Sequence, residues 1–177
     1  MNKKIIFFDG DGTLWYPKKT KYTKHPVWIY KDPKTLKEHT KHLMMIPSVL
    51  STIKRLKNKG IITVILSTHP HPPEEADFII KNKVKHFKLG NLFDEVHATR
   101  DYHESKGEFM LKILKKRKIP KSKALMVGDS YRWDYRSAKV KGIDALLIES
   151  EYMHEHPAVK RIKKTIIKLS DIFEYIA

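Results

Sequence analysis

The stretch MNKKIIFFDGDGTLWYP, residues 1–17, opens with an apolar run that ends at two aspartates, Asp9 and Asp11. A short run such as IIFF is typical of a buried strand. Two carboxylates so close together repel each other, and one of them is often forced to take up a proton. The pair therefore predicts either a cation in the same site or two acids with different chemical tasks.

The composition is that of a folded, soluble protein. The 177 residues are 41% hydrophobic and 32% charged, which separates the chain from disordered proteins and predicts a single domain over residues 1–177. No apolar run in the sequence approaches the ~18 residues of a membrane span, and IIFF is too short for a secretion signal. We therefore expect a cytoplasmic protein that does not enter the membrane.

Cysteine is absent, which excludes disulfides, thiol nucleophiles and cysteine-ligated zinc. Glutamine is absent too, and with the abundant lysine this favours a thermophilic source. The formal charge of +16 would attract polyanions or anionic substrates. The same charge also fits a lysine-rich surface that serves only solubility, so the composition leaves both interpretations open.

Apolar runs that alternate with helical patterns predict a parallel sheet. The runs lie near residues 3–9, 61–67, 94–99, 123–129 and 143–149. Helices are expected at 47–60, 74–84, 132–141 and 166–176, and from the capping-box pattern Ser105-Lys106-Gly107-Glu108 onward. This order predicts an α/β fold, a doubly wound three-layer α/β/α sandwich with a mainly parallel five-stranded sheet.

Residues 15–46 interrupt this alternation. The segment has no clear period and contains three prolines and five aromatic residues. It lies between the first strand and the first helix and is too short for a second domain. We therefore expect a small flap at about 15–46 and no full cap domain.

Polar residues gather where the predicted strands end or the next helices begin. They are Asp9, Asp11, Ser67, Thr68, Lys106, Asp129 and Asp134. In a doubly wound fold the ligand lies beyond the carboxyl ends of the strands. Several acids there form an oxygen-rich site that suits Mg²⁺, and a lysine with hydroxyl groups suits a phosphate. A carboxylate can also act as a nucleophile.

The motifs DGDGT, Ser67, Lys106 and GDSYRWD, in this order, resemble the four motifs of the haloacid dehalogenase superfamily of phosphatases. The resemblance implies that family's Rossmann-type fold and a hydrolysis of phosphate monoesters through an aspartyl-phosphate. Asp9 would attack the phosphorus, and Asp11 would protonate the leaving group and then deprotonate water. Dehalogenases lack this second acid, so Asp11 favours phosphate chemistry.

The resemblance also implies roles for the other motif residues. Ser67, Thr68 and Lys106 would bind phosphate, while Thr13 would support the loop that carries the two acids. Mg²⁺ would be held by Asp9, Asp129 and the backbone carbonyl of Asp11. Asp134 would act from beyond the direct metal ligands or orient Lys106. As a proton donor, Asp11 would need a raised pKa, while Asp9 stays ionised.

A narrower resemblance concerns the magnesium-dependent phosphatases with minimal caps. The stretches DGDGTLWYP and IPSVLSTIKRLKNKGI are similar to that subgroup. The similarity implies an open site and a phosphorylated small molecule or phosphoprotein as the substrate. We expect the flap and the loops at 69–73 and 100–105 to select it, with His69 of His69-Pro70-His71 able to touch it.

Nucleic acid is the alternative partner. From Tyr16 to Met45 the flap has eight lysines and two acids, interleaved with aromatic residues. Basic residues among aromatics are typical of a groove that binds single-stranded nucleic acid. A polynucleotide-end phosphatase, or a catalytically silent nucleic-acid-binding derivative, therefore stays open. The simpler interpretation is that the aromatics pack the flap onto the core while the lysines face water.

Overall fold

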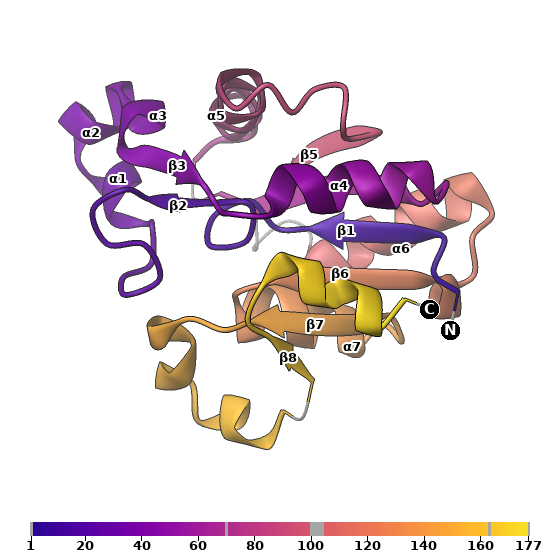
Figure 1. Ribbon diagram of the computed structural model, residues 1–177. Coiled ribbons are helices and arrows are strands. Elements are labelled where there is room, and N and C mark those ends of the chain that lie inside the picture. Colours follow the sequence, from indigo (N-terminus) through magenta and orange to yellow (C-terminus); the bar gives the residue numbers. More distant parts are fainter. Residues whose placement is uncertain (1, 70, 100–104, 163, 177) are drawn as a thin grey trace.

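A parallel sheet of six strands lies at the centre of the computed structural model, which describes residues 2–69, 71–99, 105–162 and 164–176 (Figure 1). The strand order is β5-β4-β1-β6-β7-β8. The bounds are β1 Ile5–Phe8, β4 Ile62–Thr68, β5 Glu95–Thr99, β6 Ala124–Gly128, β7 Asp144–Ile148 and β8 Thr165–Ile166. All five predicted strands are present, which confirms the α/β fold, and β8 is a sixth strand that the sequence did not predict.

The C-terminal helix predicted over 166–176 is wrong. Thr165 and Ile166 pair with β7 instead, and a single 3₁₀ helix, η5, follows at Leu169–Glu174. The neighbouring β-branched side chains favour a strand here. The helical spacing comes from Leu169, Ile172 and Ile176, which all pack into the core.

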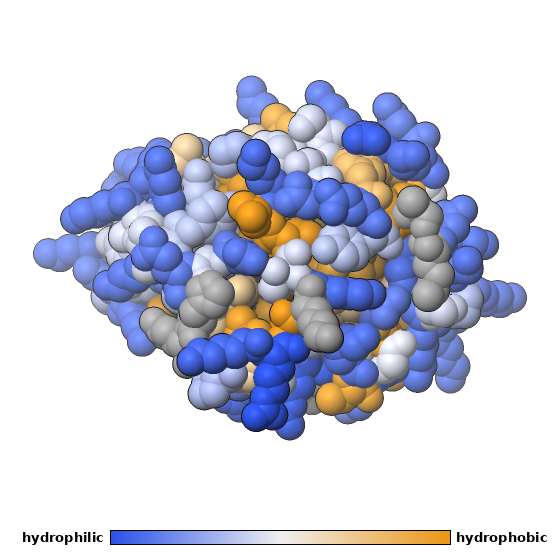
Figure 2. Space-filling view, turned by 60° about the horizontal axis from the view of Figure 1, so that its bottom comes forward, coloured by the Kyte–Doolittle hydropathy of each residue, from blue (hydrophilic) through white to orange (hydrophobic). Residues whose placement is uncertain are grey.

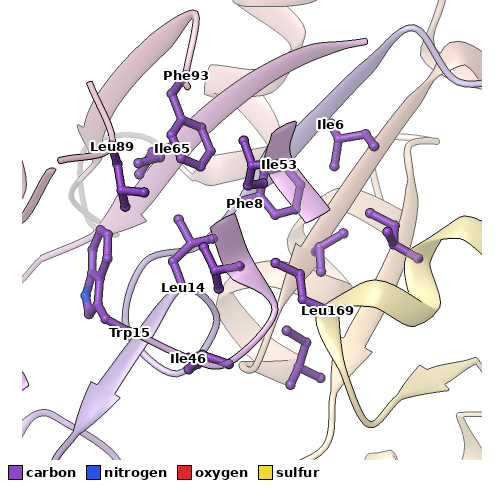
Figure 3. Packing of buried hydrophobic residues seen from close by; sticks show 14 of the residues in the cluster. Ile6, Phe8, Leu14, Trp15, Ile46, Ile53, Ile65, Leu89, Phe93 and Leu169 are labelled. Atoms are coloured by element: carbon purple, nitrogen blue, oxygen red, sulfur yellow. The ribbon is translucent and has the colours of Figure 1, made fainter. Parts of the chain in front are cut away.

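Alternate residues of the strands face opposite sides of the sheet. Ile6 and Phe8 of β1 pack against α4 (Val49–Asn58), α5 (Pro73–His86) and η5 (Figure 3). Ile5 and Phe7 pack against α6 (Lys106–Arg117) on the other face. Burial on both faces explains why the strand sequences are apolar without alternation. The three predicted layers are therefore confirmed.

The predicted capping box starts α6. The hydroxyl of Ser105 accepts a hydrogen bond from the backbone N–H of Glu108 at 3.3 Å, and the Glu108 side chain accepts one from the backbone N–H of Ser105 at 3.2 Å. These bonds satisfy two N–H groups that the helix end would otherwise leave unpaired. They also fix the start of the helix, and therefore the position of its first residue, Lys106.

The helix predicted over 132–141 is shorter and less regular than expected. It consists of a π-helical segment, η2 (Tyr131–Arg136), followed by the short helix α7 (Ser137–Lys139). The carbonyl of Ser130 accepts hydrogen bonds from the N–H groups of both Asp134 and Tyr135, which widens the turn. Such widened turns often accompany functional sites, and this one carries the buried Asp134.

The small flap is built on a two-stranded antiparallel ribbon. Strands β2 (Trp15–Pro17) and β3 (Leu43–Met45) pair, and the chain between them forms three short helices, α1 (Trp28–Lys31), α2 (Pro33–Lys37) and α3 (His39–His42). Each element is too short to show a period in the sequence. The flap lies at the end of the sheet opposite the two chain termini, where the strands have their carboxyl ends (Figure 1).

The aromatic residues of the flap point inward. Trp15, Tyr16 and Tyr30 are buried, and Tyr22 and Trp28 are partly buried against the same core cluster. Figure 3 shows Trp15 beside Leu89, with Leu14 and Ile46 close to the sheet. The flap aromatics therefore pack it onto the core, as in the simpler interpretation of its sequence, and do not form an exposed stacking row.

Hydrophilic residues cover most of the face shown in Figure 2, with small apolar areas between them. This distribution fits the formal charge of +16, since ionised lysines and arginines stay in water. Among the described residues, no helix combines the length and the apolar character that a membrane crossing requires.

Candidate active site

A cavity of about 210 Å³ opens at the carboxyl ends of β1, β4 and β6. It brings together all the site residues predicted from the sequence except Thr13: Asp9, Asp11, Ser67, Thr68, Lys106, Asp129 and Asp134. The remaining lining residues are His25, Val27, Ser130 and Trp133. Since His25 and Val27 belong to the flap segment, the flap forms one wall of the site.

Lys106 lies between two carboxylates. Its Nζ is 2.5 Å from Oδ1 of Asp9 and 2.5 Å from Oδ1 of Asp134. Burial alone would lower the pKa of Lys106, but the charges of Asp134 and Asp9 outweigh it and raise the pKa above its ordinary value. The ammonium therefore stays charged and holds both acids in place. The contact between Asp134 and Lys106 is the one that an orienting role of Asp134 requires. Its other implied role, beyond the direct metal ligands, stays a prediction.

Three carboxylates converge beside this lysine. Oxygens of Asp9, Asp129 and Asp134 lie within 4.8 Å of one another, and all three residues are buried. Burial and the neighbouring charges of Asp9 and Asp134 raise the pKa of Asp129 well above its ordinary value. Burial likewise raises the pKa of Asp134 to about 6, although Lys106 acts in the opposite direction.

The donor set fits a hard divalent cation. When all three acids are ionised, one ammonium leaves two negative charges in a buried cluster, and carboxylate oxygens are the ligands that Mg²⁺ prefers. Among the described residues, the carboxylate of Asp11 is not part of this cluster.

The carboxylate of Asp11 is bound by two aromatic residues of the flap. Its Oδ1 accepts hydrogen bonds from Nε1 of Trp15 at 2.6 Å and from the hydroxyl of Tyr30 at 2.8 Å. Burial and the charge and hydrogen bond of Asp11 raise the pKa of Tyr30 well above its ordinary value, so that hydroxyl keeps its proton. The flap thus contacts the second acid of the motif directly.

Lys83 completes the environment of Asp11, and the sequence analysis did not identify it. Its side chain is fully buried in α5, and its Nζ lies 3.1 Å and 3.2 Å from the two carboxylate oxygens of Asp11. The ammonium also lies over the ring of Tyr30, 4.4 Å from its centre. In the sequence, Lys83 shares a helix face with Ile79, Ile80 and Val84. This position could have indicated a buried lysine with an acidic partner, since an unpaired ammonium is not buried in a core.

Asp11 therefore differs from the sequence-based expectation of a raised pKa. Burial acts to raise its pKa, but the charge of Lys83 and the hydrogen bonds of Tyr30 and Lys83 prevail and lower it. In the arrangement described by the structure, Asp11 is an ionised carboxylate. Any proton that it gives to a leaving group must first be taken up against the charge of Lys83.

His69 occupies a different place from the one expected. It does not line the cavity but is buried, with Nε2 3.3 Å from Nζ of Lys83 and its ring 4.9 Å from that of Tyr30. Burial and the charge of Lys83 lower the pKa of His69 to about 3, so the ring is neutral at ordinary pH. The expectation that His69 touches the substrate is therefore replaced by a packing role beside Lys83.

The predicted hydroxyl residues have different surroundings. Ser67 is buried at the end of β4 and lines the cavity. Thr68 lines it too, but its hydroxyl lies 3.2 Å from that of Thr99 in β5. Thr13 is fully buried, and its hydroxyl has no hydrogen-bond partner within the described part of the chain. Of the loops expected to select the substrate, Pro70 and residues 100–104 lie outside the described residues.

Tyr152 is a second residue that the sequence analysis missed. Its hydroxyl donates a hydrogen bond of 2.7 Å to Oδ2 of Asp129. Gly12 lies against this pair with φ of +78°, and a Cβ placed there would come within 2.1 Å of that same Oδ2. Only glycine tolerates both the backbone angle and this close approach, which accounts for the second glycine of DGDGT.

A family model for haloacid dehalogenase-like hydrolases matches residues 13–148, which is most of the chain. The chain belongs to this family. A relative from Caldanaerobacter subterraneus subsp. tengcongensis, named as a pyrophosphatase, PpaX, is 29% identical over 115 residues. The match covers 64% of this chain and 49% of the relative, so the chain spans about half the relative's length.

Solved structures of other proteins share the fold of this haloacid dehalogenase-like hydrolase. A phosphoglycolate phosphatase structure from Haemophilus somnus 129PT has a TM-score of 0.74 at 17% identity, covering 100% of this chain and 99% of the other. A phosphatase of the family from Thermococcus onnurineus has a TM-score of 0.71 at 18% identity, covering 100% and 98%. At such low identity these likenesses establish the fold alone.

Proposed function

We propose that the chain is a Mg²⁺-dependent phosphatase that hydrolyses phosphate monoesters through an aspartyl-phosphate intermediate. The observation that carries the proposal is the buried cluster of Asp9, Asp129 and Asp134 with Lys106 between two of its members. Family membership supports it, and so does the presence of Asp11, which dehalogenases lack.

Asp9 is the proposed nucleophile. It follows β1 directly, its backbone N–H donates to the carbonyl of Val127 at 2.9 Å, and its Oδ1 contacts Lys106. A new bond would form between an oxygen of Asp9 and the phosphorus, and the bond from phosphorus to the leaving oxygen would break. Lys106 would offset the repulsion between the two anions, which is the main obstacle to attack on a phosphate dianion.

Asp9, Asp129 and the backbone carbonyl of Asp11 are the proposed holders of Mg²⁺. When bound, the ion would supply positive charge that offsets the phosphate and the acidic cluster together. Asp134 would hold Lys106 in position through the 2.5 Å contact. Ser67 would donate a hydrogen bond to a phosphate oxygen, and Thr68 would do the same while its hydroxyl accepts from that of Thr99.

Asp11 is the proposed proton carrier. As an ionised carboxylate it fits the second half of the reaction, in which water attacks the phosphorus and loses a proton. The bond from phosphorus to Asp9 then breaks, which releases phosphate and restores the carboxylate. Asp11 would take up the proton that the water loses and pass it to the leaving oxygen in the first half of the next cycle.

Two further properties belong to this proposal. The narrower resemblance to magnesium-dependent phosphatases fits a flap as small as residues 15–46. We also propose that residues 1–177 form a single hydrolase domain, because Leu14, Trp15 and Ile29 of the flap side share one buried cluster with the sheet.

Hydrolysis of a generic aryl phosphate tests the proposal. The wild-type chain should release phosphate with Mg²⁺, and chelation of the ion with EDTA should abolish the release. Asp9→Asn keeps the shape of the side chain but removes the nucleophile, and should be inactive. Wild-type turnover in Asp9→Asn, or turnover that survives EDTA, would contradict the proposal.

A further inference from the structure

A second cavity, of about 390 Å³, adjoins the active site. The two cavities share His25, Asp129, Ser130 and Trp133 as lining residues. A group attached to a phosphate in the catalytic cavity can therefore extend into the second one, which we call the aromatic cavity. The remaining residues that line it are Tyr131, Arg132, Tyr152, Met153, His156 and Pro157.

Planar rings dominate the lining of the aromatic cavity. Tyr131 and His156 lie with ring centres 4.4 Å apart, and the rings of His25 and Tyr152 lie edge to face at 5.3 Å. The guanidinium of Arg132 lies over the ring of Trp133, 4.3 Å from its centre. Three separate segments of the chain thus contribute ring faces to one space.

Several contacts hold this lining in place. The backbone N–H of Trp133 donates to the hydroxyl of Ser130 at 3.2 Å, which caps the start of the π-helical segment. The hydroxyl of Tyr152 is bound to Asp129, so that ring is tied to the acidic cluster. Tyr131 stacks against Tyr135 with ring centres 6.0 Å apart. These rings need little ordering when a ligand binds, which favours affinity.

The chemistry of the lining selects the kind of group that fits. Among the described residues that line the aromatic cavity, Asp129 is the only carboxylate, and its Oδ2 already accepts from Tyr152. The tyrosine, tryptophan and histidine rings and the one guanidinium of this lining favour contact with a planar aromatic group.

We propose that the aromatic cavity binds the leaving group of the substrate and that this group carries a planar aromatic ring. The inference rests on the proposed function and names the substrate class of the same site. Two kinds of phosphate share this chemistry: an aryl phosphate, with the ring on the ester oxygen, and a nucleoside 5′-monophosphate, with the ring one sugar away.

Two pairs of ligands test the inference by equilibrium binding to Asp9→Asn in the presence of Mg²⁺. Phenyl phosphate is compared with cyclohexyl phosphate, and uridine 5′-monophosphate with ribose 5-phosphate. Because stacking on aromatic side chains contributes about fivefold or more to affinity, the aromatic member of at least one pair should bind at least that much tighter. A preference in the first pair alone assigns an aryl phosphate, and one in the second pair alone assigns a nucleotide.

Tyr131→Leu supplies the matched variant, because Tyr131 lines the aromatic cavity and not the catalytic one. It should lower the affinity for the favoured aromatic ligand about fivefold and leave its non-aromatic counterpart unchanged. Tyr175→Leu, at a tyrosine that lines neither cavity, is the control and should change neither.

Equal affinity within both pairs would overturn the inference, as would an unchanged preference in a folded Tyr131→Leu. Turnover is measured separately with the wild type. If all four phosphates are hydrolysed at similar KM, the proposed function stands and the inference fails. If none is hydrolysed but the aromatic ligands bind tighter, the aromatic cavity does bind aromatic phosphates, whereas the proposed function, and with it the assignment of a leaving group, fails.

Discussion

Lys83 and Asp11 form a buried ion pair between α5 and the loop after β1, with both carboxylate oxygens within 3.2 Å of the ammonium. Trp15 and Tyr30 of the flap bind the same carboxylate. The second acid of the DGDGT motif is therefore held jointly by the flap and by a helix that carries none of the motif residues. Its position depends on residues outside the four motifs.

Replacing Lys83 by methionine should destabilise the fold and slow catalysis. The side chain keeps its length, but Asp11 loses its buried partner, and breaking such a pair costs about 3–5 kcal/mol of unfolding free energy. Displacement of Asp11 from its position should lower kcat by about 10²-fold. Urea unfolding and steady-state kinetics measure the two effects.

Lys81→Met on the same helix is the control, because Lys81 pairs with Asp77 at the exposed surface. In an Asp11→Asn background the cost of Lys83→Met should shrink, since the two changes remove one interaction. A Lys83→Met variant as stable as Lys81→Met would show that the pair does not hold the loop.

The pH dependence of stability should reveal the buried His69. In the folded protein its ring takes up a proton only near pH 3, whereas in the unfolded chain it does so near its ordinary value of ~6.5. Between these values the unfolded state binds more protons, so the unfolding free energy falls as the pH is lowered. This one group contributes a slope of up to ~1.4 kcal/mol per pH unit.

The comparison with His69→Gln isolates that contribution, because the acids of the site also titrate in this range. The variant should lose part of the slope between pH 6.5 and 3 in denaturant melts. His86→Gln, at an exposed histidine of α5, should keep the wild-type slope. Equal slopes in His69→Gln and the wild type would mean that the ring is not held neutral.

Lys106→Met should nearly abolish turnover. It removes the cation that contacts Asp9 and Asp134 and leaves the acidic cluster without a compensating charge. Removal of one group that stabilises developing charge typically costs about 10²–10³ in kcat. Lys116→Met, at an exposed position of the same helix, should retain wild-type kcat. A modest effect of Lys106→Met, below about tenfold, would remove Lys106 from the proposed mechanism.

The features that the sequence predicted are those whose position depends on residues close together in the chain. Asp9 and Asp129 follow apolar strands directly and Ser67 lies near the end of another, so strand ends in the sequence place them together once the sheet is parallel. Lys106 is fixed by its capping box in the same local way. These residues could be predicted because their positions follow from short-range sequence patterns.

Other features depend on contacts between distant segments. Lys83 meets Asp11 across 72 positions, and Tyr152 meets Asp129 across 23, and no local pattern identifies the partner in either pair. Strand β8 has two residues and is defined only by its pairing with β7. The lowered pKa of Asp11 follows from Lys83, so it could not be predicted before that lysine was placed.

Mg²⁺ should stabilise the fold, and Asp129→Asn should remove the effect. A ligand that binds only the folded state raises its stability with concentration, so the wild type should melt higher with Mg²⁺ than with EDTA. Because burial and the charges of Asp9 and Asp134 raise the pKa of Asp129, the neutral variant relieves repulsion. In EDTA it should therefore melt no lower than the wild type.

Thermal melts of both proteins in both conditions measure this prediction. Asn keeps an oxygen that can accept from Tyr152, so the change is confined to charge. A Mg²⁺-dependent rise of equal size in Asp129→Asn would place the ion elsewhere. A variant that melts lower in EDTA would show that the acidic cluster is not under electrostatic strain.

Trapping the covalent intermediate tests the central claim, that Asp9 becomes phosphorylated, most directly. The wild type is mixed with Mg²⁺ and an aryl phosphate, quenched during turnover and reduced with borohydride, which converts an aspartyl-phosphate to homoserine. Peptide mass spectrometry should find homoserine at position 9 in the wild type and none in Asp9→Asn. Continued phosphate release with no modification at position 9, or modification at another residue, would contradict the account.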